Sequence, residues 1–279
     1  MVPCITCIMR TRSPRLMGGD FMSIVFFDID GTLVDKQHKL PLSAVKAVRK
    51  LRENGHKAYI NTGRCLCTIQ SDVLNIGFDG IVASCGTSIH TPEKTLLERT
   101  ISPLLLYNML PIFEHQGIDL WLEGPHYLYV SDPQADGFMG NIISYLKQDK
   151  DNIRSWHDTS LVVNKFTYRS TRLEQLEPLR DMLRENFEVI HYNDLVGEVL
   201  MKGYNKASGI DFMLEHLGNP DEETFAFGDS PNDLSMLSRA DHAVAMGDGD
   251  ERAIAAAEYV TTAPDRDGIY LALKHYKLI

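Results

Sequence analysis

The chain has 279 residues, of which 44% are hydrophobic and 24% are charged, as in globular proteins with a full core. Its formal net charge of -10 at pH 7 disfavours nucleic-acid binding, because that affinity comes largely from lysines and arginines that contact phosphates. The longest apolar runs, such as Pro103 to Leu106, are far shorter than the roughly 20 residues of a membrane helix. No nucleic-acid partner and no membrane association are therefore expected.

The cysteines and residues 1–21 indicate the cellular compartment in which the protein is expected. Five cysteines form an odd set in a chain too long to need disulfide bonds, which favours a reducing cytoplasm. Residues 1–21 are basic and acid-poor but lack the continuous apolar core of a signal peptide, and Met22 directly precedes the first strand-like run. We predict that residues 1–21 are a disordered leader or an overlong start, with a transit peptide as the alternative.

The next residues alternate between strand and helix patterns. The apolar run SIVFF at 23–27 predicts a buried parallel strand. Val45, Val48 and Leu51 predict a helix that is capped by Ser43 and stops at the Asn-Gly pair 54–55. Strands at 57–61 and 80–83 with a helix at 65–74 complete a β-α-β-α-β order, which predicts a parallel sheet with right-handed crossovers.

This alternation stops after Ser84 and returns at Lys206. In between, strands are predicted near 119–122, 126–130 and 164–169, and helices near 105–115 and 173–186. After it come helices at 206–217, 234–237, 251–257 and 268–275 and strands at 224–227 and 242–245. The sequence thus predicts an α/β fold: a Rossmann-like parallel sheet core from residues 22–84 and 197–279, with an inserted α+β cap domain at 85–196. Such an insert would lie over the carboxyl ends of the strands, where open α/β sheets bind ligands.

Acidic residues follow two of the predicted strands. The first strand ends in Asp28-Ile29-Asp30-Gly31-Thr32, a spacing that suits a carboxylate nucleophile beside a second carboxylate used as acid and base. The strand at 224–227 leads into Gly228-Asp229-Ser230-Pro231-Asn232-Asp233. Oxygen ligands of this kind suit Mg²⁺ when a phosphate completes its coordination. Taken singly, the two segments are also readable as an Asp-Gly turn and a helix cap.

These residues resemble motifs of the haloacid dehalogenase superfamily, specifically of its Cof-like phosphatases with the larger α/β cap. FFDIDGTLVD resembles the first motif, TGR at 62–64 the second, Lys206 in GYNKASGI the third and GDSPNDLSML the fourth. The resemblance runs from Met22 to the end of the chain. It implies a Mg²⁺-dependent phosphatase that acts on a small phosphorylated metabolite, such as a sugar phosphate, a nucleotide or a cofactor phosphate, through an aspartyl-phosphate.

The resemblance also implies a role for each matching residue. Asp28 would attack phosphorus, and Asp30 would protonate the leaving oxygen and then deprotonate water. The remaining roles are metal binding by Asp28, the backbone carbonyl of Asp30 and Asp229, phosphate binding by Thr62, Gly63, Lys206 and Asn232, and support by Asp233 and Arg64. The family usually has an Asn-Gly pair where this chain has Cys85-Gly86, which leaves substrate preference open.

The predicted cap is expected to close over the site and to recognise the leaving group. The candidates for this recognition are Trp121, Glu123, His126 and Lys165, each of which could instead belong to the cap core or its surface. Two alternative functions remain at this point: a phosphomutase that uses the same pair of aspartates, and a protein that binds phosphorylated ligands without turnover. The sequence does not indicate an oligomeric state.

Overall fold

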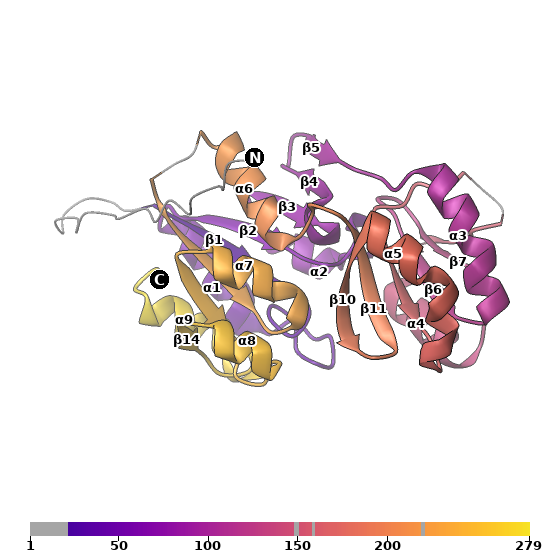
Figure 1. The fold of residues 1–279 in the computed structure, drawn as a ribbon. Helices are drawn as coiled ribbons and strands as arrows, with labels where there is room; N and C mark the ends of the chain where they lie inside the picture. Colours follow the sequence, from indigo (N-terminus) through magenta and orange to yellow (C-terminus); the bar gives the residue numbers. More distant parts are fainter. Residues whose placement is uncertain (1–21, 148–150, 158–159, 219–220) are drawn as a thin grey trace, which may run out of the picture.

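The computed structural model describes residues 22–147, 151–157, 160–218 and 221–279, which form two lobes with one large β-sheet each (Figure 1). The leader expected at residues 1–21 lies outside the described residues. The first sheet has the strand order β14-β13-β12-β1-β2-β3-β4-β5. Its strands are β1 (Ser23–Phe27), β2 (Lys57–Asn61), β3 (Gly80–Ala83), β4 (Ser88–His90), β5 (Thr95–Glu98), β12 (Glu223–Gly228), β13 (His242–Ala245) and β14 (Tyr259–Val260).

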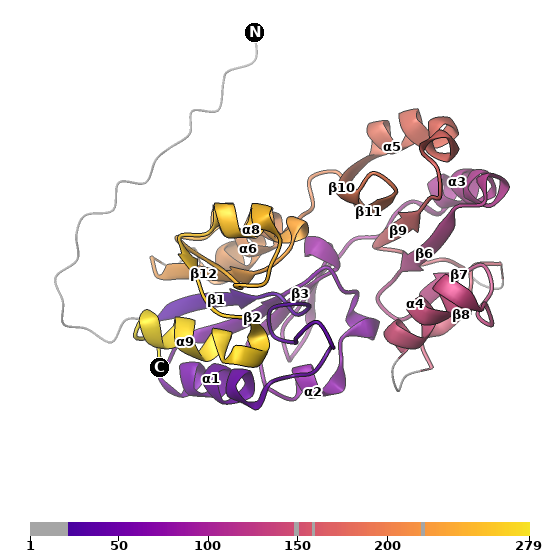
Figure 2. The same cartoon turned by 90° about the horizontal axis from the view of Figure 1, so that it is seen from below.

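The first sheet is parallel from β14 to β3, and β4 and β5 add an antiparallel edge. Figure 2 shows helices on both of its faces. Alternate residues of β1 point to opposite faces, as the pleat of a strand requires. Val25 and Phe27 pack with α1 (Leu42–Glu53) and α9 (Gly268–His275), whereas Ile24 and Phe26 pack with α6 (Lys206–His216), α7 (Leu234–Arg239) and α8 (Glu251–Ala256). Because both faces are buried, β1 is apolar throughout.

The second sheet has the order β10-β11-β9-β6-β7-β8 and is mostly antiparallel. Its strands are β6 (Asp119–Glu123), β7 (Leu128–Val130), β8 (Ile153–Ser155), β9 (Lys165–Arg169), β10 (Phe187–Asn193) and β11 (Val196–Met201). Helices α3 (Pro103–Gln116) and α5 (Arg180–Asn186) pack on one face. Helix α4 (Gly137–Lys147) packs on the other face, at the β6-β7-β8 end.

The change from one sheet to the other does not coincide with the predicted cap boundaries. Strands β4 and β5 lie within the predicted cap at 85–196 but extend the first sheet. Strand β11 begins at Val196 and belongs to the second sheet, although residues from 197 onward were predicted to lie in the core. The second sheet and its helices therefore fall between β5 and α6.

Three local predictions were wrong in detail. The helix predicted at 65–74 is a 3₁₀ turn at Leu66–Thr68 followed by the short α2 (Ser71–Leu74). Here the Thr68 hydroxyl bonds to the Cys65 carbonyl, which competes with regular helical bonding. The segment predicted as a helix at 173–186 is 3₁₀ as far as Leu179, where Pro178 lacks an amide donor, and α-helical only afterwards. Pro41, not Ser43, is the N-cap of α1.

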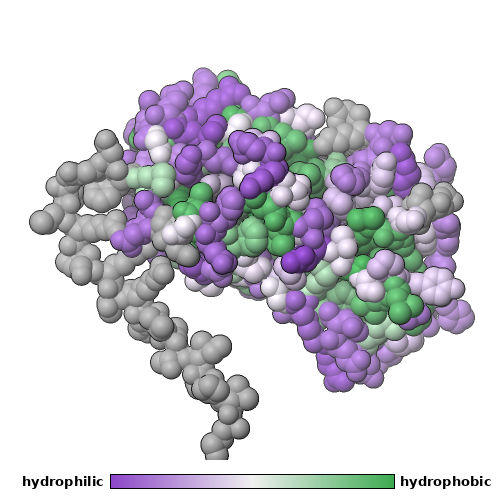
Figure 3. All heavy atoms as spheres, turned by 90° about the horizontal axis from the view of Figure 1, so that it is seen from above, coloured by the Kyte–Doolittle hydropathy of each residue, from purple (hydrophilic) through white to green (hydrophobic). Residues whose placement is uncertain are grey.

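No helix in the described part of the chain is long and apolar enough to cross a membrane. The face of the molecule seen in Figure 3 is largely hydrophilic, with smaller hydrophobic patches on both lobes.

Candidate active site

A buried lysine lies between two aspartates at the carboxyl end of the parallel strands. Asp28 directly follows β1 and its side chain is buried. Lys206, the first residue of α6, is fully buried, and its Nζ donates to Asp28 Oδ1 at 2.8 Å and to Asp233 Oδ1 at 2.6 Å. Because an ammonium is stable in such a place only when it is paired, the two carboxylates hold Lys206 against the end of β1.

The loop after β12 brings a third aspartate, Asp229, close to Asp28 and Asp233. Asp233 Oδ2 accepts the backbone N–H groups of Asp229 and Ser230, both at 2.9 Å, and so fixes this loop. Gly31 has a φ of +72°, and a Cβ there would lie 2.2 Å from Asp229 Oδ2. Only glycine fits this position, since any side chain would meet the Asp229 carboxylate.

The acidic cluster fits a hard divalent cation. Each of Asp28, Asp229 and Asp233 offers an oxygen, and these oxygens lie within 4.8 Å of one another. Burial raises the pKa of Asp28 to about 7, with Lys206 opposing the shift and Asp233 and Asp30 adding to it. Burial and the neighbouring carboxylates raise the pKa of Asp229 to about 8. The ionised carboxylates of this cluster repel one another, and Mg²⁺, which prefers oxygen ligands, would offset that repulsion.

Asp30 points to a different set of partners. Arg64 binds its carboxylate with both Nε and Nη2, at 2.7 and 2.6 Å, and the Tyr145 hydroxyl of α4 donates to Oδ1 at 2.7 Å. Burial alone disfavours the charged form, but hydrogen bonds from Arg64, His38 and Tyr145 outweigh it and hold the pKa of Asp30 well below its ordinary range. In this arrangement Asp30 is a carboxylate held in place by three side chains.

The predicted phosphate-binding residues gather on the first lobe. Thr62 and Gly63 follow β2, where the Thr62 hydroxyl accepts the backbone N–H of Arg64 at 3.1 Å. A Cβ on Gly63 would lie 2.9 Å from Asn232 Nδ2, so the two loops are in close contact. The side chain of Asn232 donates to Tyr192 and Glu198 of the second lobe at 3.1 and 3.3 Å.

The four predicted cap candidates have different surroundings. Trp121 is buried in an apolar cluster with Leu128 and Ile143. His126 is exposed in the turn between β6 and β7. Glu123 and Lys165 form a buried ion pair of 2.6 Å on neighbouring strands.

Sequence reasoning missed Tyr145, Tyr192 and Glu198, which extend from the second lobe to predicted site residues. Tyr145 lies on α4, which was not predicted, although Met139, Ile142, Ile143 and Leu146 recur at helical spacing in its sequence. Glu198 was placed on the core side of the predicted domain boundary. The strand-like alternation of VGEVLM at 196–201 was the available signal for it.

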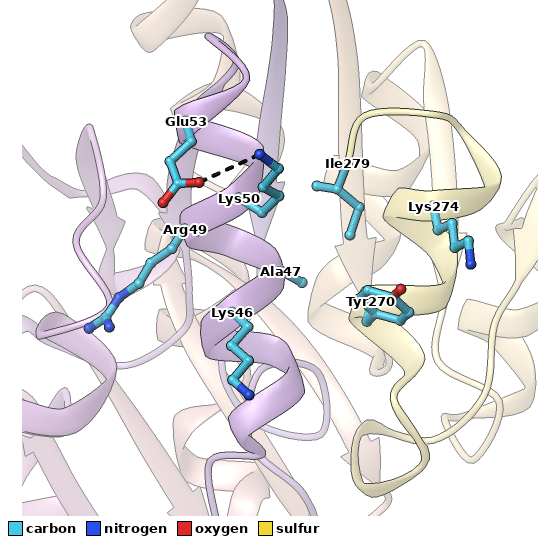
Figure 4. Close-up of a pocket in the computed structure, with 8 residues that line it drawn as sticks. All are labelled: Lys46, Ala47, Arg49, Lys50, Glu53, Tyr270, Lys274 and Ile279. Atoms are coloured by element: carbon cyan, nitrogen blue, oxygen red, sulfur yellow. Dashed lines mark ion pairs between the residues drawn. The ribbon is translucent and has the colours of Figure 1, made fainter.

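A surface groove of about 530 Å³ lies elsewhere, between α1 and α9. It is lined by Lys46, Ala47, Arg49, Lys50, Glu53, Tyr270, Lys274 and Ile279, none of which is a predicted site residue. Figure 4 shows the charged groups of Arg49, Lys46 and Lys274 pointing in different directions. They do not converge on one ligand.

Parallel strands that end in an aspartate cluster beside a buried lysine, with a second lobe inserted in the chain, define a haloacid dehalogenase-like hydrolase. The model of the family with that description matches residues 25–273, and the chain belongs to this family. The predictions of an α/β fold, of this superfamily and of a phosphomonoester hydrolase are confirmed.

The similarity to known proteins extends over nearly the whole chain. The putative phosphatase YkrA of Bacillus subtilis is 25% identical, over 92% of this chain and 98% of its own. A phosphoglycolate phosphatase of Methanothermobacter thermautotrophicus is 26% identical, over 91% and 99%. The solved structure of BT4131, described as a subclass IIB sugar phosphatase, is 30% identical, with a TM-score of 0.76 over 92% of this chain and 100% of that one.

Proposed function

We propose that this phosphatase is Mg²⁺-dependent and hydrolyses a small phosphorylated metabolite through an aspartyl-phosphate on Asp28. The observation that carries the proposal is the convergence of Asp28, Asp229 and Lys206 at the end of the parallel sheet. The relatives are named as phosphatases, which gives no support to a phosphomutase or to a binding protein without turnover.

In the proposed reaction, Asp28 Oδ attacks phosphorus and the bond from phosphorus to the ester oxygen breaks. Asp30 gives a proton to that oxygen and later takes one from the water that cleaves the acyl phosphate, so the same carboxyl serves both steps. Lys206 offsets negative charge beside Asp28, and Thr62, Gly63 and Asn232 would bind phosphate oxygens. Mg²⁺, held by Asp28, the carbonyl of Asp30 and Asp229, would reduce repulsion between the nucleophile and the phosphate.

The ion pair between Arg64 and Asp30 sets a condition on these two reaction steps. A carboxyl whose pKa is held low by two guanidinium hydrogen bonds stays ionised, which suits the base and not the acid. We infer that the bond from Arg64 to Asp30 opens before the first step, and that Arg64 then turns to the substrate phosphate. Asp30 can take up a proton once this partner has left.

We further propose that the second lobe acts as a cap that recognises the leaving group. Its side chains Tyr145, Tyr192 and Glu198 contact Asp30 and Asn232 of the first lobe, so a substrate bound there would meet the second lobe as well. Glu123 and Lys165 belong to the same buried network as Glu198. Roles for Trp121 and His126, and a cytoplasmic location, remain predictions from the sequence.

Substitution of the nucleophile tests the proposal. Asp28→Asn keeps the size of the side chain but removes the attacking charge, so phosphate release from p-nitrophenyl phosphate with Mg²⁺ should fall by more than about a thousandfold. Circular dichroism should show an unchanged fold. The matched control is Asp194→Asn, an exposed residue in the turn between β10 and β11, which should behave as the wild type. Wild-type activity in Asp28→Asn would contradict the mechanism.

A further inference from the structure

The second sheet presents charged side chains to the first lobe. In β9, Phe166 and Tyr168 pack in the cluster formed with α3 and α5, so Lys165 and Thr167 lie on the opposite face. By the same alternation, Leu122 and Val199 face the helices, whereas Glu123 of β6 and Glu198 of β11 share the face with Lys165. Helix α4 packs beside this part of the sheet, against Trp121 and the residues of β7 and β8.

These charged side chains form one buried network. Lys165 Nζ lies 2.6 Å from Glu123 Oε1 and 2.9 Å from Glu198 Oε1, and Thr167 donates to Glu123 at 3.0 Å. All three charged side chains are at most 5% exposed. Since a buried carboxylate is costly without a partner, Lys165 fixes both glutamates in position.

Glu198 is the member of this network that touches the first lobe. Its Oε2 accepts from Asn232 Nδ2 at 3.3 Å and from the Tyr192 hydroxyl at 2.8 Å. Its Oε1 lies 3.5 Å from the Cys85 thiol, and a Cβ on Gly63 would be 3.0 Å away. The carboxylate therefore stands beside two of the residues that we propose to bind phosphate, on the side of the second lobe.

The charge of this network limits which leaving groups it can accept. Lys165, the cation of this network, is paired with both Glu123 and Glu198, so the three side chains together are negatively charged and do not attract an anionic ligand. A carboxylate such as Glu198 accepts hydrogen bonds from the hydroxyl groups of a leaving group, and it repels a leaving group that carries a carboxylate. Lys165 and hydrogen bonds from Tyr192 and Asn232 outweigh burial and lower the pKa of Glu198, which keeps it charged.

We propose that Glu198, held by Lys165 and Glu123, selects phosphate esters whose leaving group carries neutral hydroxyls and rejects those whose leaving group is anionic. On substrate binding, hydroxyls of the leaving group replace Asn232 and Tyr192 as donors to Glu198. This inference rests on the proposed function and narrows its substrate class to polyol and sugar monophosphates. The named relatives include both a sugar phosphatase and a phosphoglycolate phosphatase, and phosphoglycolate carries an anionic leaving group.

Two pairs of substrates that differ in a single group test the inference on the wild-type protein. Sorbitol 6-phosphate and 6-phosphogluconate differ in a terminal hydroxymethyl or carboxylate group, as do glycerol 3-phosphate and 3-phosphoglycerate. In both pairs, kcat/KM with Mg²⁺ should favour the neutral member by at least about tenfold. An equal or reversed preference in both pairs overturns the inference, and this measurement requires no variant to fold.

The variant Glu198→Gln tests whether Glu198 causes the preference. Glutamine keeps the shape and one acceptor but removes the negative charge, so the preference within each pair should shrink by about tenfold or more. Glu188→Gln, on the exposed side of β10, is the matched control and should keep the wild-type preference. An unchanged ratio in a folded Glu198→Gln protein overturns the inference.

Failure of the proposed function would look different. p-Nitrophenyl phosphate has a good leaving group with no hydroxyl for Glu198 to bind, so its hydrolysis by the wild type reports the phosphatase chemistry alone. Absence of this hydrolysis in the presence of Mg²⁺ contradicts the proposed function, and with it the inference. Hydrolysis of this ester without preference within the pairs contradicts only the inference.

Discussion

Tyr145 joins the second lobe to the proposed acid and base. Its hydroxyl donates to Asp30 Oδ1 at 2.7 Å and accepts from Arg64 Nη2, and its ring lies 4.1 Å from that of His38. Arg64 can only donate hydrogen bonds, whereas a tyrosine hydroxyl can donate or accept. Tyr145 can therefore stay bound to Asp30 in both of its protonation states.

Removal of this hydroxyl should affect esters that need a proton on the leaving oxygen. For Tyr145→Phe we expect kcat for an alkyl phosphate, such as glycerol 3-phosphate, to fall about fivefold, the effect of one hydrogen bond of about 1 kcal/mol. The fall for p-nitrophenyl phosphate should be smaller, because nitrophenolate leaves without a proton. Steady-state kinetics on both esters measure the difference.

The control for this prediction is Tyr107→Phe, an exposed tyrosine on α3 of the same lobe. It should leave both rates unchanged. An equal loss on alkyl and aryl esters in Tyr145→Phe would mean that the tyrosine supports the structure and does not position Asp30.

At the scale of elements, the sequence predicted the parallel core best. The bounds of β1, β2, β3, β13 and α9 agree with the structure to the residue. These elements are short apolar runs between turn residues, or a helix with one apolar face, and local pattern is enough to define them. The acidic motifs directly follow β1 and β12 of this parallel sheet, so the convergence of Asp28 and Asp229 could be expected from the sheet topology.

The second sheet was predicted only in part, because its strands depend on distant partners. β8 of this sheet, like β4 and β14 of the first sheet, has three residues or fewer and no periodic signal of its own. β10 and β11 form a hairpin whose turn lacks the glycine that usually marks one. The Glu123-Lys165-Glu198 network joins residues up to 75 positions apart by number (123 and 198), and no local spacing predicts it.

The start of β1 depends on a histidine that lies outside the strand. The backbone N–H of Ser23 donates to His56 Nδ1 at 3.0 Å, so the neutral ring ties β1 to the turn before β2. Burial lowers the pKa of His56 below its ordinary value of 6.5. The folded state thus binds a proton on His56 less readily than the unfolded state does. The stability that His56 contributes is therefore present above about pH 6.5 and is lost as the pH falls below that value.

The substitution His56→Asn tests this dependence, since the Asn oxygen can accept the same hydrogen bond and does not titrate. The free energy of unfolding of the wild type, relative to His56→Asn, should be higher near about pH 8 than near about pH 5. Urea denaturation at the two pH values measures the difference. The exposed His191→Asn on β10 is the control. A difference independent of pH would show that the ring stays uncharged throughout or does not hold Ser23.

At the scale of the whole molecule, the acidic site opposes folding when no cation is bound. The pKa values of Asp28 and Asp229 are raised to about 7 and about 8, from ordinary values of 3.8. A raised pKa in a carboxyl means that the folded state binds the proton more tightly than the unfolded state. The apoprotein should therefore lose stability from these groups as the pH rises from about 4 to about 8, while the two sites are forced to ionise.

Mg²⁺ should reverse this loss, because it binds the ionised carboxylates of the folded state. Free Mg²⁺ at about one hundred times its Kd stabilises a protein by about 2.7 kcal/mol. Protons compete for the same oxygens, so the rise in Tm on adding Mg²⁺ should be larger near about pH 8 than near about pH 6. Differential scanning calorimetry with Mg²⁺ or EDTA at both pH values measures this rise without any reference to activity. In Asp229→Asn, which lacks one of the ionised ligands, the rise in Tm should be mostly lost. If the Tm of the wild type does not respond to Mg²⁺ at either pH, this result would argue against a cation at this cluster, even if the enzyme hydrolyses phosphate esters.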